Sequence, residues 1–368
     1  MSDRTKESGS LVPKKRHPLA AWLKRFGTLR DEPSLLEGSL LGVAMIGLVF
    51  FVWWILTRGE SDARILDPYT LPSIKETFST FPSLWFERGL SISAMVSLGR
   101  VLAGFLIAAA IAVPLGLLAG SYFRIGAMLK PISIFGRNIP IAALIPLTLI
   151  WFGLGEVQKV MFIFLAAVTF VLFDTTSAAR AVPDRFLETA YTLGAKRNWS
   201  KGLRLSCLVG LIYALIASLG WQFLQEQGSM NVVVEAIPGA PEPNPFLEAM
   251  ATGKFWIRAT IGFVLGFGLW FPILSHQTLR KVIMPMAMPD VVNSLRLLFG
   301  LAFGYIMLAE VINAKRGLGA LINLSQRQGP REHIYLCLIA IALLAWAIDK
   351  LILWIQRQAF PHLKHGQD

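Results

Sequence analysis

Eight apolar stretches of roughly 20 residues recur along this chain of 368 residues. A helix of about 20 apolar residues is long enough to cross the hydrocarbon core of a bilayer, and within lipid a helix satisfies its own backbone polar groups. The stretches therefore predict an all-α fold, a polytopic membrane helical bundle of about eight spans. They cover residues 38–56, 94–119, 137–156, 157–173, 203–224, 255–274, 291–312 and 334–355.

Charged residues are few, and they lie between the apolar stretches. They make up 16% of the chain, against about 25% in a typical soluble domain. The net charge of +12 does not indicate a nucleic-acid partner, because the Lys and Arg residues gather in tails and loops as the positive-inside rule describes. Basic residues precede the first stretch and acidic residues follow it, so we expect a multi-pass protein with both termini in the cytoplasm.

The sequence carries no signature of catalysis, metal binding or nucleotide binding. Cys207 and Cys337 lie far apart in apolar surroundings and imply no disulfide framework. The five histidines form no HExxH motif and no Cys/His spacing typical of a metal site. A GxxxxGKS or GxxxxGKT motif is absent too. We expect no catalytic residue, no metal and no cofactor bound by this chain, so any ATP must bind to another chain.

The third stretch, residues 137–156, is interrupted by two prolines. Each proline removes a backbone hydrogen bond, so a broken helix here should pack in protein or line a cavity rather than face lipid. Discontinuous helices often form transport sites, although a proline-kinked structural helix explains the pattern equally well. The candidate pathway residues are Asn138, Pro140, Pro146, Thr148 and Trp151.

Arg100 lies inside the second stretch, near its outer end. An Arg one or two turns inside a span usually snorkels to the interface or pairs within the bundle. We therefore favour a structural role for Arg100, by snorkelling or by pairing, over a pathway role. Further along the same stretch, Gly116 and Gly120 predict a face that packs closely against another helix.

A polar segment, residues 188–195, interrupts the membrane-like pattern with the sequence ETAYTLGA. The pattern is typical of a short helix that ends at Gly194, and Glu188 near its start would favour the helix through the helix dipole. Basic residues on both sides place the segment on the cytoplasmic face. It resembles the EAA loop, the coupling motif of permease subunits in binding-protein-dependent ABC importers, with Thr189 at the position of the motif's first alanine.

Three further blocks are similar to the nitrate/sulfonate/taurine class of these permeases. Their order and spacing extend the resemblance over roughly Leu71 to Ile355. The first block comprises Leu71-Pro72-Ser73, Ser97 to Phe105 and Pro114 to Gly116. The second comprises Ile139-Pro140, Ala142, Pro146-Leu147, Trp151 to Glu156 and Lys159. The third comprises Lys281 to Pro285, Pro289 and Ser294 to Arg296, and it continues through Glu310 to Gly317-Leu318-Gly319.

The main departure from the family's pattern is an insert within the coupling loop. In the family the Gly-Ala continues directly into a basic, proline-ended second half, which here is the sequence LRKVIMP at residues 279–285. The insert, residues 200–276, has two apolar runs, basic flanks and an acidic, proline-rich middle, which predicts a membrane hairpin with its loop outside. Gly262 and Gly266 predict a close-packing face in it. We expect the hairpin to dock a partner or to shape a dimer.

The expected organisation is a six-span permease core plus the inserted two-span hairpin. Its segments are a basic cytoplasmic tail at 1–37, a first span at 38–57, an extracytoplasmic loop at 58–93, the first part of the core with the coupling loop at 94–199, the hairpin at 200–276, the second part of the core at 277–355 and a cytoplasmic tail at 356–368.

The resemblance implies a permease subunit of an ATP-driven ABC importer in the bacterial plasma (inner) membrane, which forms the pathway for a small anionic solute. The implied partners are cytoplasmic ABC ATPase subunits that bind ATP and Mg, an extracytoplasmic substrate-binding protein, a second permease copy or related chain, and membrane lipid. A non-transporting membrane scaffold or sensor on a permease core is the alternative. The implied coupling residues are Glu188, Thr189, Ala190, Gly194, Ala195, Arg280, Lys281 and Pro285.

Overall fold

The computed structural model describes residues 28, 33–59, 64–229 and 253–361. Most of the expected basic N-terminal tail, the acidic middle of the insert and the last residues of the C-terminal tail lie outside these ranges. Within the described part the ordered elements are helices, and the one isolated β-bridge belongs to no strand. The chain divides into two compact units, residues 1–75 and 76–368.

The first unit contains one long apolar helix, α2 (Leu35–Leu56). The Ser34 hydroxyl accepts a hydrogen bond from the Glu37 backbone N–H at 3.3 Å and so caps the start of the helix. In the most apolar part of this helix, no residue is buried by other parts of the protein. This is expected of a helix that is apolar on every face and surrounded by lipid. The Trp53 indole donates to the Pro72 carbonyl at 2.9 Å, which fixes the chain after the helix.

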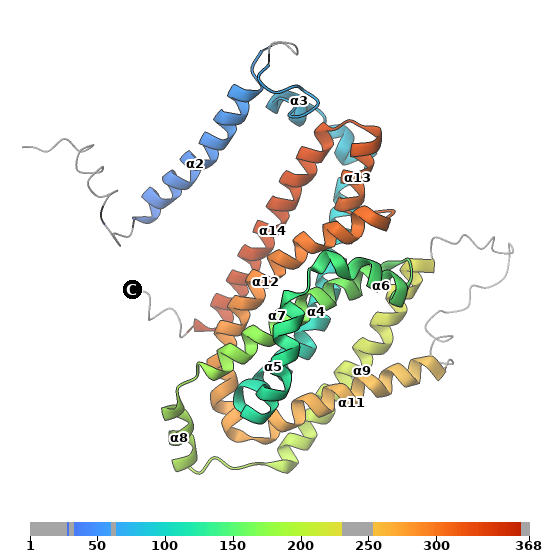
Figure 1. The fold of residues 1–368 in the computed structure, drawn as a ribbon. Helices are drawn as coiled ribbons and strands as arrows, with labels where there is room; N and C mark the ends of the chain where they lie inside the picture. Colours follow the sequence, from blue (N-terminus) through green and yellow to red (C-terminus); the bar gives the residue numbers. More distant parts are fainter. Residues whose placement is uncertain (1–27, 29–32, 60–63, 230–252, 362–368) are drawn as a thin grey trace, which may run out of the picture. The chain divides into compact units, whose positions relative to one another are not determined.

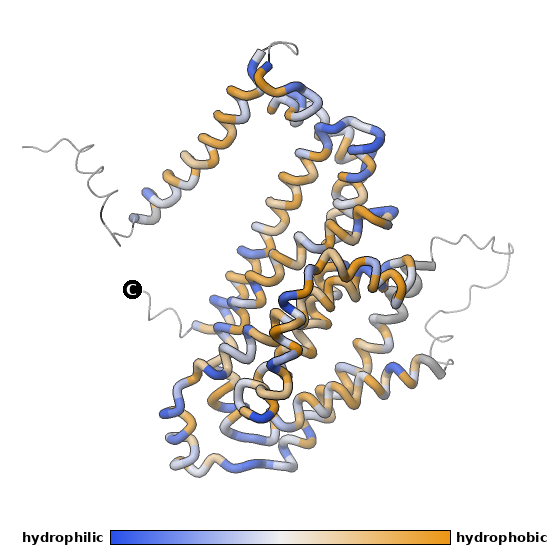
Figure 2. The backbone as a smooth tube through the Cα atoms, viewed as in Figure 1, coloured by the Kyte–Doolittle hydropathy of each residue, from blue (hydrophilic) through white to orange (hydrophobic). Residues whose placement is uncertain are grey.

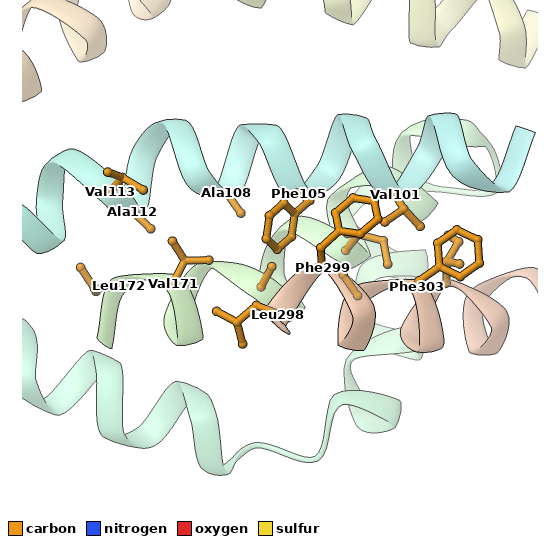
Figure 3. Close-up of a cluster of buried hydrophobic side chains, with 14 of the residues drawn as sticks. Val101, Phe105, Ala108, Ala112, Val113, Val171, Leu172, Leu298, Phe299 and Phe303 are labelled. Carbon is orange, nitrogen blue, oxygen red and sulfur yellow. The ribbon is translucent and has the colours of Figure 1, made fainter. Parts of the chain in front are cut away.

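The core of the second unit is formed by α4 (Leu90–Ser121), α7 (Glu156–Arg180) and α12 (Met284–Asn313). Figure 3 shows apolar side chains of these three helices facing one another, among them Phe105 of α4 and Phe299 of α12, whose rings meet edge to face at 5.4 Å. A Cβ at Gly116 or Gly120 would lie 2.5 Å from a side-chain atom of α7. The predicted close-packing face is therefore confirmed.

A broken helix pair packs beside this core. Helix α5 (Phe123–Asn138) is followed by the short turn η3 (Ile141–Ala143) and by α6 (Leu144–Phe152), and the two helices meet at 90°. The predicted break is confirmed and lies at Pro140. Pro146 instead falls in the first turn of α6, where its missing N–H leaves no helical bond unmade. The segment before the break is the helix α5, and Pro131 lies within it.

The insert forms two helices, α9 (Trp199–Ser229) and α11 (Gly253–Ser275), which Figure 1 shows side by side. A Cβ at Gly262 would overlap Tyr213 and Ala214 of α9, and a Cβ at Gly266 would overlap the Tyr213 side chain. The predicted close-packing face of the hairpin is therefore confirmed. The Tyr213 hydroxyl donates to the Ala110 carbonyl of α4 and accepts from the Trp270 indole at 3.1 Å. This chain of two hydrogen bonds joins the hairpin to the core.

The last helices are α13 (Leu318–Gln328) and α14 (Glu332–Ala359). Helix α13 was not predicted from the sequence, because its polar residues break the apolar period that identifies a span. Within the described residues, seven helices are long and apolar enough to cross a membrane, and the bent pair α5–α6 makes an eighth span if it is counted as one. The predicted polytopic helical bundle is confirmed.

Candidate functional site

The first half of the split loop is the helix α8 (Asp184–Thr192), which follows α7 after the turn at Pro183. Our placement of Glu188 near the helix start is wrong, because the helix begins at Asp184 and the acidic residue of its first turn is therefore Asp184. Glu188 lies one turn further along and is exposed. Figure 2 shows hydrophilic residues concentrated in α8 and the segment after it, in contrast to the apolar bundle helices.

Gly194 ends the helix, as the sequence predicts. Its φ of +79° lies in the left-handed region that glycine adopts without strain, and the Ala195 N–H returns to the Ala190 carbonyl at 2.9 Å. The preceding residue, Leu193, is 83% exposed. The turn therefore displays a large apolar side chain at the tip of a polar segment.

The second half of the loop is the π-helical turn η4 (Leu279–Ile283) together with the start of α12. Leu279 and Ile283 are buried and hold the turn against the core, whereas Lys281 and Pro285 are exposed and Arg280 is half-buried. Pro285 occupies the first turn of α12, where a proline costs no helical hydrogen bond.

The structure brings the two halves together at the base of the hairpin. Arg197 and His276 form an antiparallel bridge, and the Asn198 N–H donates to the Ser275 carbonyl at 2.8 Å. A Cβ at Gly202 would lie 2.6 Å from the Ser275 Cβ, so the backbones of α9 and α11 approach closely here. The insert therefore leaves and rejoins the loop at one place.

A groove of about 460 Å³ lies between α8 and the second half of the loop. Both halves contribute to its walls. The lining residues are Phe186, Thr189, Ala190, Leu193, Ala195, Gln277, Thr278, Lys281, Val282 and Met286. Four predicted coupling residues, Thr189, Ala190, Ala195 and Lys281, thus face one groove, and the remaining four are not among its lining residues.

His276 is the centre of contacts at this junction. Its ring meets the Tyr122 ring, from the turn between α4 and α5, edge to face at 6.3 Å. The Arg197 guanidinium lies over the Trp199 ring at 3.8 Å. Partial burial and the nearby Arg197 charge lower the pKa of His276 below its usual value of 6.5, and burial raises the pKa of Tyr122. Both rings are therefore uncharged at neutral pH.

The five predicted pathway residues divide into two groups. Thr148 is buried, and its hydroxyl donates to the Ile145 carbonyl and accepts from the Gln158 amide, both at 2.9 Å. Its hydrogen bonds are thus made within the bundle. Asn138, Pro140, Pro146 and Trp151 are exposed and follow one another along the α5–α6 break, and Trp151 is 58% exposed.

A buried polar cluster joins α4, α7 and α12, and sequence reasoning missed it as a group. The Arg100 guanidinium donates to both oxygens of Glu156, at 2.5 and 2.7 Å, and to Glu310 at 2.7 Å. The Ser97 hydroxyl lies 2.7 and 2.8 Å from the two oxygens of Glu310. Of the two structural roles expected for Arg100, the structure shows pairing within the bundle. One feature of the sequence could have indicated this cluster: each of the three family-like blocks contains one of its charged residues, Arg100, Glu156 or Glu310.

Comparisons with known proteins agree with this architecture. A family described as "Binding-protein-dependent transport system inner membrane component" matches residues 112–221 and 274–365, more than half of the chain, and the match is interrupted within the inserted hairpin. A protein of Methanocaldococcus jannaschii named as an ABC transporter permease is 23% identical over 326 residues, which are 87% of this chain and 91% of the relative.

Two other relatives carry names that include a solute. The bicarbonate transport system permease protein of Synechococcus elongatus is 24% identical over 89% of this chain and 92% of its own length. The taurine transport system permease protein of Escherichia coli is 20% identical over 89% of this chain and 90% of its own length. The similarity therefore covers nearly the whole of each relative.

Proposed function

The chain belongs to the family of binding-protein-dependent transport system inner membrane components and is a membrane permease subunit of an ABC importer, and on that premise we propose that it couples to a separate ATPase through α8. The observation that supports this coupling role most directly is the bridge between Arg197 and His276. It keeps the loop compact although an insert divides the loop in sequence.

The exposed surface of α8 has the properties of a docking knob. Tyr191 and Leu193 are 61% and 83% exposed, and Glu188 lies beside them with its carboxylate free to meet a basic partner. Exposed aromatic and apolar groups surrounded by charge are typical of an interaction surface. We assign this surface to a cytoplasmic ABC ATPase, in which ATP and Mg bind.

The connections of α8 give a physical route for coupling. Residues 181–183 join it directly to α7, and the groove residue Met286 joins it to α12. Helices α7 and α12 pack against each other and against α4 as one core. Movement of α8 by closing ATPases would therefore rotate these helices as a body, which is the rigid-body class of switching transition.

The solute is a small anion in this proposal. The names of two relatives refer to bicarbonate and taurine, and each of these molecules carries an anionic group. An extracytoplasmic binding protein would deliver the solute, and a second permease copy would complete the pathway. The protein would lie in the plasma (inner) membrane with both termini in the cytoplasm, as the positive-inside rule predicts.

Co-purification tests the coupling role. The full-length protein, extracted gently from its native membrane, should carry a stoichiometric ATPase subunit, and Glu188→Arg should remove that subunit. Glu87→Arg is the matched control, because Glu87 is also exposed but precedes α4 at the opposite end of the core. Recovery of other membrane partners without an ATPase would favour a scaffold or sensor instead.

A further inference from the structure

Arg137 places a positive charge inside the membrane-spanning part of the bundle. It lies in the last turn of α5, beside the 90° break, and its guanidinium stacks over the Phe173 ring of α7 at 3.6 Å. Phe173 is seven residues from the end of α7 at Arg180, or about 10 Å along the helix axis. The charge therefore lies inside a span and not at its end.

This charge lacks the partner that such a group normally has. Buried ionisable groups inside membranes pair with one another or with carbonyls, as Arg100 does with Glu156 and Glu310. Among the residues that the structure describes, no carboxylate oxygen lies within 4.0 Å of the Arg137 nitrogens. Its Nε is buried and has no hydrogen-bond acceptor.

A second unsatisfied donor lies beside the first. The Thr169 hydroxyl of α7 is also buried without a hydrogen-bond partner. Thr169 touches Gly136, the residue before Arg137, because a Cβ at Gly136 would overlap the Thr169 side chain. Two buried hydrogen-bond donors without an acceptor at one contact between α5 and α7 are unusual, since nearly all buried polar groups form hydrogen bonds. A ligand that accepts hydrogen bonds would satisfy both.

We infer that Arg137 and Thr169 form a binding site for a small oxyanion at the α5–α6 break. A guanidinium stacked on an aromatic ring presents its N–H groups at its edge, where its planar fork matches two oxygens of a carboxylate, sulfonate or similar group. The exposed residues Asn138 and Pro140 directly follow Arg137 along the chain, at the break. The inference rests on the proposed transport function and specifies the chemistry that its pathway recognises.

Asp174 supplies the competing explanation. It follows Phe173 and lies within electrostatic reach of Arg137. Arg137 could thus be only a distant counter-ion of Asp174. Removing both charges separates the two explanations, because a counter-ion pair is dispensable as a pair, whereas an anion site is lost with its cation.

The test uses the purified full-length protein in detergent and measures thermal stabilisation by sodium methanesulfonate, sodium formate and sodium sulfate. Dimethyl sulfone, which has the size of methanesulfonate without its charge, is the control ligand. At least one of the anions should stabilise the wild type, and dimethyl sulfone should not. Arg137→Gln should abolish that stabilisation, Arg137→Lys should weaken the apparent affinity about tenfold or more, and Thr169→Val should weaken it several-fold.

Two further variants complete the test. Lys130→Gln, on an exposed position of the same helix, should bind as the wild type does, and Arg137→Gln/Asp174→Asn should remain unable to bind. If none of the three anions distinguishes the wild type from Arg137→Gln, or if the double variant regains binding, the inference is wrong. Because co-purification of the ATPase is measured on the same preparations, a failure of the anion site is distinguishable from a failure of the proposed coupling.

Discussion

Arg197 and His276 lie at opposite ends of the inserted hairpin, yet their backbones pair as an antiparallel bridge. The pairing closes the coupling loop across the insert, so the hairpin projects from the loop without separating its halves. Loop closure costs free energy that grows only slowly with loop length, and the close packing of α9 on α11 at Gly262 and Gly266 offsets that cost.

Removal of the hairpin should leave the coupling loop able to dock. In a variant with residues 200–274 deleted and a Gly-Ser turn in their place, the two halves can meet as they do now, because Arg197 and Asn198 keep their backbone partners His276 and Ser275. We expect the ATPase to co-purify with this variant, whereas assembly with the second permease copy should weaken. Native mass spectrometry of the purified complex measures both. Loss of the ATPase together with normal dimerisation would contradict this expectation.

Substitutions at Gly194 should act through backbone strain alone. A Cβ there meets open space, but φ is +79°, which costs an ordinary L-residue about 1–2 kcal/mol. Gly194→Val should therefore disturb the end of α8 and reduce ATP-dependent uptake strongly, whereas Gly194→Asn should reduce it little, because Asn tolerates this conformation. Uptake and membrane abundance are measured together, so that a folding defect is recognised. Equal uptake by both variants would show that the turn is not needed for coupling.

The buried cluster around Arg100 should control stability more than coupling. Glu310 is 0% exposed and accepts hydrogen bonds from Arg100, Ser97 and the Gly319 N–H. Glu310→Gln leaves Arg100 with one carboxylate partner fewer in a dry site, and breaking a buried pair costs about 3–5 kcal/mol. Ser97→Ala removes only a hydroxyl and should cost about 1–3 kcal/mol. In thermal unfolding in detergent, Glu310→Gln should therefore lower the midpoint more than Ser97→Ala. The opposite order would argue against the buried ion pairs as the main stabilising contacts of the cluster.

The bundle was predictable from the sequence because apolar length and charge placement follow directly from the properties of the bilayer. The α5–α6 break was also predictable, because the missing N–H of Pro140 is a local property of the sequence. The Arg100 cluster was not predictable in the same way, because its partners come from three helices that only tertiary packing brings together. Glu188 was misplaced in its helix because the true start depends on the turn at Pro183, and helix boundaries are the least reliable feature of a sequence pattern.

Acidification should weaken the junction at His276. The pKa of His276 is lowered in the folded protein, so the unfolded chain binds the proton more tightly, and folding stability falls as the pH drops through about 6.5 towards the lower folded pKa. The physical cause is partial burial together with the neighbouring charge of Arg197. The thermal unfolding midpoint should therefore fall between pH 7.5 and 5.5.

His276→Gln should reduce that pH dependence, since glutamine keeps a polar side chain at the bridge but does not titrate. His17→Gln is the matched control, because His17 belongs to the basic N-terminal tail, far from the junction in sequence, and it should leave the pH dependence unchanged. Co-purification of the ATPase across the same pH range then reports on function. If the coupling loop holds its shape through this junction, the wild type should lose the ATPase at lower pH in step with the fall in midpoint, and His276→Gln should retain it. An identical pH profile for His276→Gln and the wild type would place the acid-sensitive group elsewhere.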